Sequence, residues 1–240
     1  MSSFPCSSSS SPSSSPCTDK APAKRFSKAA FFQNRLLDVV RPKSCYLGSE
    51  EVRVGAKGRR AVLIYACPAQ VKEEGMRDRI QDFPHFHHEH TERLVTFSEE
   101  DEGVVAHTIA TRWNVMAVDR DDPTIVLGAM FFDTRYVFRA GKGAFSVLTH
   151  ILAAGVVHDL RRKGIGYAMA DLAGNHLANQ AFEFNATLAK TSLNGFGSIS
   201  KAIILADFVS EGGERVCDAF VDSASILEVD GVEMTYDAGF

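Results

Sequence analysis

The stretch that decides the fold runs from Val156 to Asn179 and reads VVHDLRRKGIGYAMADLAGNHLAN. Residues 145–157, which lead into it, form an almost unbroken apolar run rich in Val, Leu and Ile, which predicts a strand buried on both faces. Beyond Gly164, apolar residues recur at the spacing of one helical face. They are Ile165, Met169, Leu172, Ala173 and Leu177. A buried strand, a basic loop and an amphipathic helix in one run predict a mixed α/β or α+β domain.

The loop between this strand and helix has the composition of an anion-binding site. The first turn of a helix leaves backbone N–H groups without partners, and the helix dipole adds about half a positive charge there. Gly164 and Gly166 lack the Cβ atoms that would keep a phosphate away from those donors, and three cations precede them, Arg161, Arg162 and Lys163. The pattern predicts a pyrophosphate cradle. The alternative is a basic turn whose glycines allow a helix to pack closely on the sheet.

The rest of the chain supplies further expected elements. A β-run at 61–67 precedes a charged helix at 70–82, and strands at 113–119 and 124–133 form a hairpin around the polar turn 120–123. Further along we expect a strand at 184–188, a helix at 199–208 and closing strands at 216–220 and 226–236. Strands on both sides of helices fit one mixed sheet.

At this point the sequence resembles the GNAT superfamily of acyl-CoA N-acyltransferases. Arg161-x-x-Gly164-x-Gly166 matches the family's Gln/Arg-x-x-Gly-x-Gly/Ala signature, Val156 stands at the apolar end of its fourth strand, and the hairpin around Gly128 is similar to its second and third strands. The resemblance covers about residues 95–210. It implies that Val156 and Val157 pair with the pantetheine arm of acetyl-CoA. It also implies that the pyrophosphate is held by Arg161, Arg162, Lys163, Gly164, Ile165 and Gly166, with Ala168 along the helix start.

The resemblance implies a GNAT-like mixed central sheet flanked by helices, as a single domain over residues 45–240. It further implies transfer of an acetyl or other acyl group from acyl-CoA to a primary amine by direct attack, the acceptor being a small molecule or a protein amine. His150 stands where histone-type members carry a strand glutamate as general base, and imidazole has a suitable pKa of about 6.5. The alternative for His150 is a buried histidine bonded to backbone.

The catalytic acid departs from the family pattern. Many members carry a tyrosine shortly after an Asn-containing turn, but none follows Asn194 closely here. Tyr236 or Tyr167 could substitute, and neither is favoured by spacing. Acyl carrier protein could replace coenzyme A as the acyl donor.

Two other classes of function compete with acyl transfer. The cluster His85, His87, His88 and His90 could bind Zn²⁺ or Fe²⁺ and serve a metal-dependent hydrolase. Because a charged segment and Phe-Pro precede the cluster where that hydrolase fold requires a strand, a solvated loop is the simpler interpretation. A GNAT-fold binding module without catalysis is the third class.

Composition excludes several broad classes. The 240 residues carry a net charge of −4, which argues against nucleic acid as a partner, and no apolar run approaches the roughly 20 residues of a membrane span. Residues 1–17 contain ten serines and three prolines, and residues 20–41 are basic. We expect residues 1–44 to be disordered. They are either a targeting signal to an organelle or for secretion, or an extension of a cytoplasmic protein. A homodimer is a possible assembly.

Overall fold

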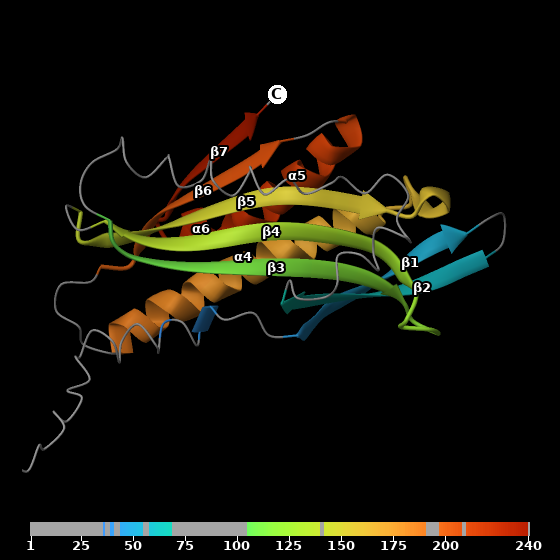
Figure 1. Cartoon of the computed structure of the whole chain (residues 1–240), viewed down its shortest axis with the longest axis horizontal. Coiled ribbons are helices and arrows are strands. Elements are labelled where there is room, and N and C mark those ends of the chain that lie inside the picture. Colours follow the sequence, from blue (N-terminus) through green and yellow to red (C-terminus); the bar gives the residue numbers. More distant parts are fainter. Residues whose placement is uncertain are drawn as a thin grey trace, which may run out of the picture.

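The computed structural model describes residues 36, 39–40, 44–54, 58–68, 105–139, 142–190, 197–207 and 210–239. These residues form one seven-stranded sheet in the order β1 to β7, with a layer of helices behind it in the view of Figure 1. The strands are β1 (Cys45–Val54), β2 (Gly58–Pro68), β3 (Val105–Asp119), β4 (Val126–Arg139), β5 (Ala144–Val156), β6 (Ile199–Asp207) and β7 (Glu233–Gly239). The helices are η1 (His158–Leu160), α4 (Ile165–Lys190), α5 (Glu211–Ala224) and α6 (Ile226–Val229).

The sheet is mixed, as the sequence predicts. The first five strands pair antiparallel in chain order, while β5 pairs parallel with β6 and β6 parallel with β7. A parallel pair needs a long crossover connection. Helix α4 supplies it between β5 and β6, and α5 with α6 supplies it between β6 and β7.

The main core lies between one face of the sheet and α4, α5 and α6. Three ring contacts mark this face: Trp113 of β3 meets His176 of α4, Tyr136 stacks on Phe184 of α4, and Phe132 meets Phe220 of α5. Leu36 and Val40 are buried in the same cluster. We call the opposite side of β2 to β6 the outer face. Its residues alternate along each strand with those of the core face.

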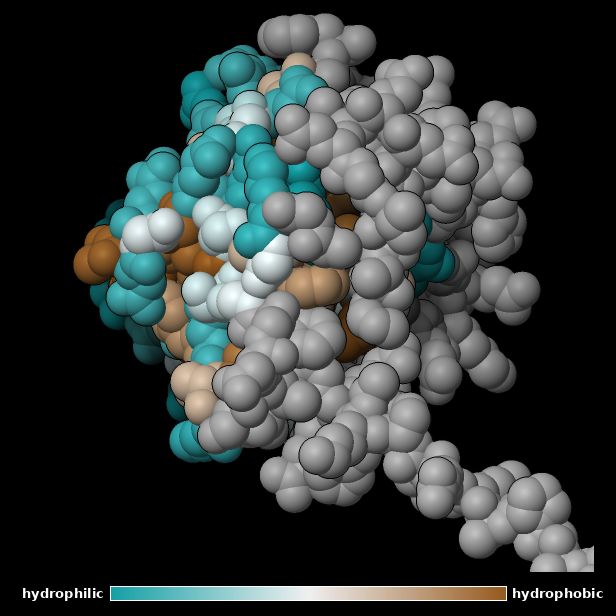
Figure 2. All heavy atoms as spheres, turned by 90° about the vertical axis from the view of Figure 1, so that its left-hand side faces the viewer, coloured by the Kyte–Doolittle hydropathy of each residue, from teal (hydrophilic) through white to brown (hydrophobic). Residues whose placement is uncertain are grey.

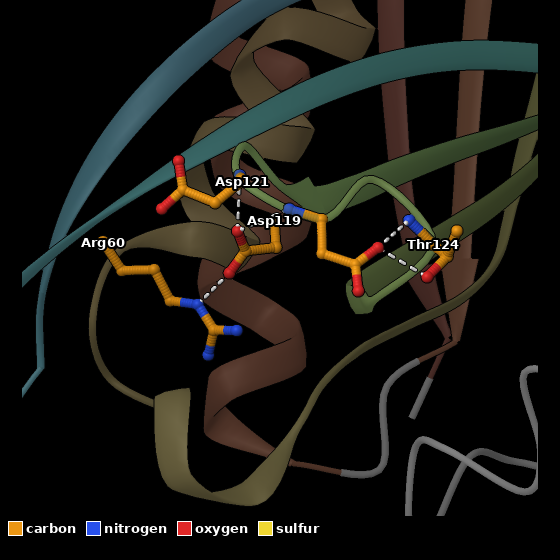
Figure 3. A network of polar contacts seen from close by, with 5 residues as sticks. Arg60, Asp119, Asp121 and Thr124 are labelled. Carbon is orange, nitrogen blue, oxygen red and sulfur yellow. Dashed lines mark hydrogen bonds and ion pairs between the residues drawn. The ribbon is translucent and has the colours of Figure 1, made fainter.

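The predicted hairpin is confirmed, with longer strands than the sequence suggested. The turn between β3 and β4 is organised by two aspartates (Figure 3). Asp119 pairs with Arg60 of β2 and accepts the Asp121 N–H at 2.7 Å and the Asp122 N–H at 3.2 Å. The Asp122 carboxylate accepts from the N–H and hydroxyl of Thr124 at 3.0 and 2.6 Å.

Two predicted elements have the wrong secondary structure because each was assigned from too short a stretch of sequence. Residues 184–188, expected as a strand, are the last turns of α4, where Leu177, Ala181, Phe184 and Leu188 line the buried side. Residues 199–208, expected as a helix, instead form strand β6, which ends at Asp207. Beyond Ile199, the buried residues of β6 are Ala202, Ile204 and Ala206, which lie on one face of the strand. Helix α4 therefore has 26 residues.

The C-terminal prediction is wrong in one part and right in another. Residues 216–220, expected as a strand, lie in α5, which Ser210 caps by accepting the Gly213 N–H at 3.2 Å. The predicted strand 226–236 divides into α6 and the first half of β7. The predicted helix 70–82 and most of the segment 1–44, which the sequence predicts to be disordered, lie outside the described residues. Within that segment Leu36 and Val40 are described, and both are buried in the main core.

Figure 2 shows the end of the molecule at which β4 turns into β5 and α4 ends. Hydrophilic and intermediate residues cover most of the described surface there, and hydrophobic atoms gather near its edge. The basic loop before α4 lies at the opposite end (Figure 1). The cationic loop therefore lies at the C-terminal end of β5, away from the turn between β4 and β5.

Candidate functional site

The basic loop folds into a short connection at the end of β5. Residues His158–Leu160 make one turn of 3-10 helix, in which the Arg161 N–H donates to His158 O at 3.2 Å. The Arg161 side chain turns back, and its Nε donates to Val156 O at 3.2 Å. Arg162, Lys163 and Gly164 are exposed. The loop therefore faces solvent and not the protein interior.

Gly164 and Gly166 serve different structural roles. Gly164 has a φ of +92°, which side chains rarely adopt, and a Cβ built there would meet nothing within 4 Å. Gly166 lies inside α4, where a Cβ would come within 3.2 Å of Val216 of α5 and 3.7 Å of Val156. Gly164 thus leaves open space at the helix start, whereas Gly166 serves close packing, which was the alternative for both glycines.

The start of α4 presents backbone donors. The first bond within the helix runs from the Ala168 N–H to Gly164 O at 2.9 Å. The N–H groups of Ile165, Gly166 and Tyr167 therefore have no partner within the helix. Arg162 has a φ of +60°, so the peptide groups before Gly164 change direction sharply. Three N–H groups next to exposed cations make an arrangement that suits an anion.

β5 leaves β6 before it reaches this loop. The parallel register ends at Ile151 with Ala206, and β6 ends one residue later at Asp207. In β4, Phe131 pairs with Ala153 and Phe132 with Ile151, so Leu152 is an extra residue, a β-bulge. Bulges increase twist and end pairing. Along residues 152–156, no described strand pairs with the β5 edge that faced β6.

Val156 and Val157 differ in what they offer along this edge. The Val157 N–H donates to Leu127 O at 2.9 Å, so it is used by the sheet. Because backbone groups alternate in direction along a strand, the groups of Val156 face the open side. Its carbonyl accepts from Arg161 there. Of the two residues predicted to hold a pantetheine arm, only Val156 faces the open edge.

His150 lies where β5 and β6 are about to separate, and it is 9% exposed. It is opposite Asp133 in β4 and Leu205 in β6, and its Nε2 lies 3.9 Å from Oδ2 of Asp207. Asp133 is held by Arg112 of β3 through bonds of 2.6 and 3.1 Å. Of these two carboxylates, that of Asp207 faces the imidazole of His150, whereas that of Asp133 is paired with Arg112. Asp207 was missed from the sequence because its strand was predicted as a helix.

The two tyrosines considered as acids do not meet His150. Tyr236 is paired with Ile204, which pairs with Thr149, so its ring lies on the core face, whereas His150 is on the outer face. Burial raises the pKa of Tyr236, and the neighbouring Cys217 and Asp218 raise it further. Tyr167 lies in the first turn of α4 and is 60% exposed. The arrangement offers neither tyrosine as an acid beside His150.

The adjacent residues Phe131 and Phe132 of β4 face opposite sides of the sheet. Phe132 contacts Phe220 in the main core. Phe131 forms a second buried cluster on the outer face with Ala129 and Ala153. Only Phe131 is placed to line a site beside His150.

The histidine cluster at residues 85–90 lies outside the described residues. Among the residues that are described, no group of three or more His, Cys, Asp or Glu side chains comes together as a metal site. Cys45, Cys67 and Cys217 are free thiols there, and burial raises the pKa of Cys67 to about 11.

Comparison of the chain with protein-family models, curated proteins and solved structures gave no match. None of the described helices combines the length and apolar character of a membrane span.

Proposed function

We propose that the protein is an N-acyltransferase that transfers an acetyl or other acyl group from acyl-CoA to a primary amine. One observation carries the proposal: the edge of β5 beyond the bulge at Leu152, with which no strand among the described residues pairs, leads directly into an exposed, cationic helix start at Gly164. An open strand edge suits an extended amide-containing arm, and the helix start suits a diphosphate. Coenzyme A carries both groups in that order.

Under this proposal each part of the loop has a task. The N–H groups around Gly164 and Ile165, with Arg161 to Lys163 beside them, bind the pyrophosphate. Val156 pairs with a pantetheine amide, and Ala168 lies along the helix start. Six residues separate Val156 from His150, so about 20 Å of strand lies between them. This length is comparable to an extended pantetheine arm and directs the thioester toward His150.

The chemistry needs few protein groups. The acceptor enters as an ammonium, and His150 removes a proton from it to give the neutral amine. The amine nitrogen then attacks the thioester carbonyl, the new C–N bond forms as the C–S bond breaks, and the thiolate leaves. The thiolate recovers a proton from solvent or from the product nitrogen. Asp207, whose Oδ2 lies 3.9 Å from Nε2 of His150, is placed to pair with the imidazolium that forms.

Thermal shift with acetyl-CoA, followed by thiol release with a panel of amines, tests the proposal. Acetyl-CoA should raise Tm, and at least one amine should release free coenzyme A. A protein that acetyl-CoA stabilises but that releases no thiol with any amine would be a non-catalytic binding module. Stabilisation by Zn²⁺ and not by acetyl-CoA would favour the metal-dependent hydrolase.

A matched pair of glycine variants assigns the site. Gly164→Glu should abolish the shift with acetyl-CoA, because its carboxylate enters the space that the diphosphate needs. Gly231→Glu is the control, since Gly231 also has a positive φ, of +80°, and open space around its Cβ. Both variants place a side chain at a positive φ and add one negative charge. Equal shifts in the two variants would remove the loop from the site.

A further inference from the structure

Strand β7 is one edge of the sheet, and its free side has no partner within the described part of the chain. It is last in the strand order and pairs with β6 on its other side. Because backbone groups alternate in direction along a strand, every second residue of β7 points its N–H and C=O away from β6. The register with β6 has no bulge, and Glu233–Gly239 contains neither proline nor lysine. Since these are the features that commonly block an edge, the backbone of β7 can accept a further strand.

The side chains of β7 leave this edge accessible. Glu233, Thr235 and Asp237 continue the outer face of β6, and all three are exposed. Met234 and Tyr236 alternate with them on the core face and are partly buried. A strand added here therefore has acidic side chains beside it on the outer face and α5 beside it on the core face.

A row of carboxylates on α5 lies beside the same edge. Glu214, Asp218 and Asp222 are exposed and follow one another at intervals of four residues, which places them along one side of the helix. Burial raises the pKa of Tyr236, and the neighbouring Cys217, Asp218 and Glu214 raise it further. The row therefore faces β7. Figure 1 shows α5 and β7 together at this edge of the sheet.

The negative charge of this edge is not balanced by cations among the described residues. Like charges four residues apart destabilise a helix, and Arg215, which lies within the same turns of α5, pairs with Glu211 and not with the row. On β7, Glu233 pairs with Lys201 at 3.1 Å, but Asp237 has no cation beside it. The edge therefore favours a partner that brings positive charge.

The spacing of the carboxylate row matches that of an extended strand. Four residues of a helix rise about 6 Å, and two residues of a strand span about 6.7 Å. A strand paired with β7 directs every second side chain to the face on which α5 lies. Basic side chains at alternate positions of such a strand can therefore each meet one carboxylate of the row.

Charge argues against a second copy of this chain as the partner. Two β7 strands paired antiparallel about Thr235 would set Glu233 of each opposite Asp237 of the other, and like charges in directly opposite positions are destabilising. The other edge strand, β1, carries charges of both signs next to one another, since Glu51 pairs with Arg59 at 3.2 Å. The acidic edge at β7 is therefore suited to a different partner.

We propose that the free edge of β7 binds an extended basic peptide, whose Lys or Arg side chains at alternate positions pair with Glu214, Asp218 and Asp222 of α5. The main chain of the peptide adds to the sheet beside β7. The basic side chains on its other face lie near Asp237. The proposal is independent of acyl transfer, because it involves neither the basic loop nor His150.

The probe is the peptide acetyl-Thr-Lys-Thr-Lys-Thr-Lys-Thr-amide, and calorimetry on the full chain at low ionic strength should show saturable binding. Two further versions carry N-methyl groups on the backbone, one at the lysines and one at the threonines. Because one alternate set of N–H groups faces β7, one version should lose at least about tenfold in affinity and the other should bind like the parent. Equal affinities of the two methylated versions, or no binding of the parent, would overturn the proposal.

Paired double variants test the charges. Asp218→Asn with Asp222→Asn should weaken binding about three- to tenfold. It should not lower Tm, because it removes like charges that are four residues apart. Glu50→Gln with Asp121→Asn is the control: it neutralises exposed carboxylates on β1 and in the turn between β3 and β4, and changes the net charge equally. Equal losses in the two double variants, or peptide-induced changes of amide resonances along β1 in place of β7, would refute the assignment.

Discussion

At the scale of the residue, glycines in and behind the basic loop act by different physical means. Gly164 supplies a backbone angle and open space, whereas Gly174, ten residues further along α4, supplies contact. A Cβ at Gly174 would lie 2.3 Å from Phe220 O and 3.1 Å from Ala224 N, so α4 and α5 touch through their backbones there. The close approach of α5 depends on this missing side chain.

We therefore predict opposite effects for two glycine-to-alanine changes. Gly174→Ala should lower the free energy of unfolding by about 1–3 kcal/mol, because backbone atoms must move apart. Gly212→Ala, at an exposed position of α5 with no clash, should raise it by about 0.4–1 kcal/mol. Urea denaturation measures both. A Gly174→Ala protein as stable as the wild type would show that the two helices are not in contact here.

His150 gives a prediction about catalysis. Under the proposed mechanism, His150→Gln should lower kcat by about 10²- to 10⁴-fold, because glutamine cannot take up the proton. The thermal shift with acetyl-CoA should not change, since His150 lies far along β5 from the loop. Thiol-release kinetics provide the measurement, and unchanged kcat would remove His150 from the mechanism.

At the scale of the element, the sequence predicted correctly those helices and strands whose apolar periodicity is visible within a single segment. The hairpin of β3 and β4, the buried strand β5 and the start of α4 all follow from patterns within one segment. The exchange of strand and helix at residues 184–188 and 199–208 arose because apolar segments this short do not show whether their period is that of a helix or of a strand. In α4 the buried positions Ala181, Phe184 and Leu188 continue a helical face that begins at Ile165, so only the longer window identifies it.

The turn between β3 and β4 gives a prediction at this scale. Burial raises the pKa of Asp119, but the bonds from Arg60 and from the N–H groups of Asp121 and Asp122 outweigh it, and the pKa is lowered. The carboxylate therefore stabilises the fold above its unfolded pKa of about 3.9, and this contribution is lost as pH falls through the lower folded value.

Asp119→Asn should cost about 1–3 kcal/mol at pH 7 and weaken the dependence of stability on pH below about 4. Urea denaturation between pH 2.5 and 7 measures it. Asp121→Asn is the control, because Asp121 contributes its N–H and not its exposed carboxylate. Equal losses in the two variants would contradict the assigned role of Asp119.

At the scale of the whole molecule, the helical layer over the sheet gives a second pH dependence. Burial lowers the pKa of His176, whose ring meets the edge of Trp113. The unfolded chain then binds a proton more readily than the folded protein, so stability falls as pH drops through about 6.5 toward the lower folded pKa. His176→Phe should flatten Tm between pH 7 and 5.5, whereas exposed His158→Ala should not. An unchanged slope in His176→Phe would refute this assignment.

The sequence alone identified the basic loop as a candidate site, but not the residues that the fold places around the loop and His150. Arg161, Gly164 and Gly166 follow from a motif, and so does His150 on its strand. The bulge at Leu152 and the position of Asp207 beside His150 depend on register between strands far apart in sequence, which no local pattern encodes. Likewise, the sequence does not show that Gly166 serves close helix packing whereas Gly164 leaves open space, because this difference depends on how α5 packs on α4.

Titration of coenzyme A into isotope-labelled protein, followed through the backbone amide resonances, tests the central claim most directly. The account predicts the largest changes at the N–H groups of Arg162 to Gly166, smaller ones at Val156, and none at Gly231. Saturable binding that leaves the Gly164 and Ile165 resonances unmoved, or no binding at millimolar coenzyme A, would contradict it.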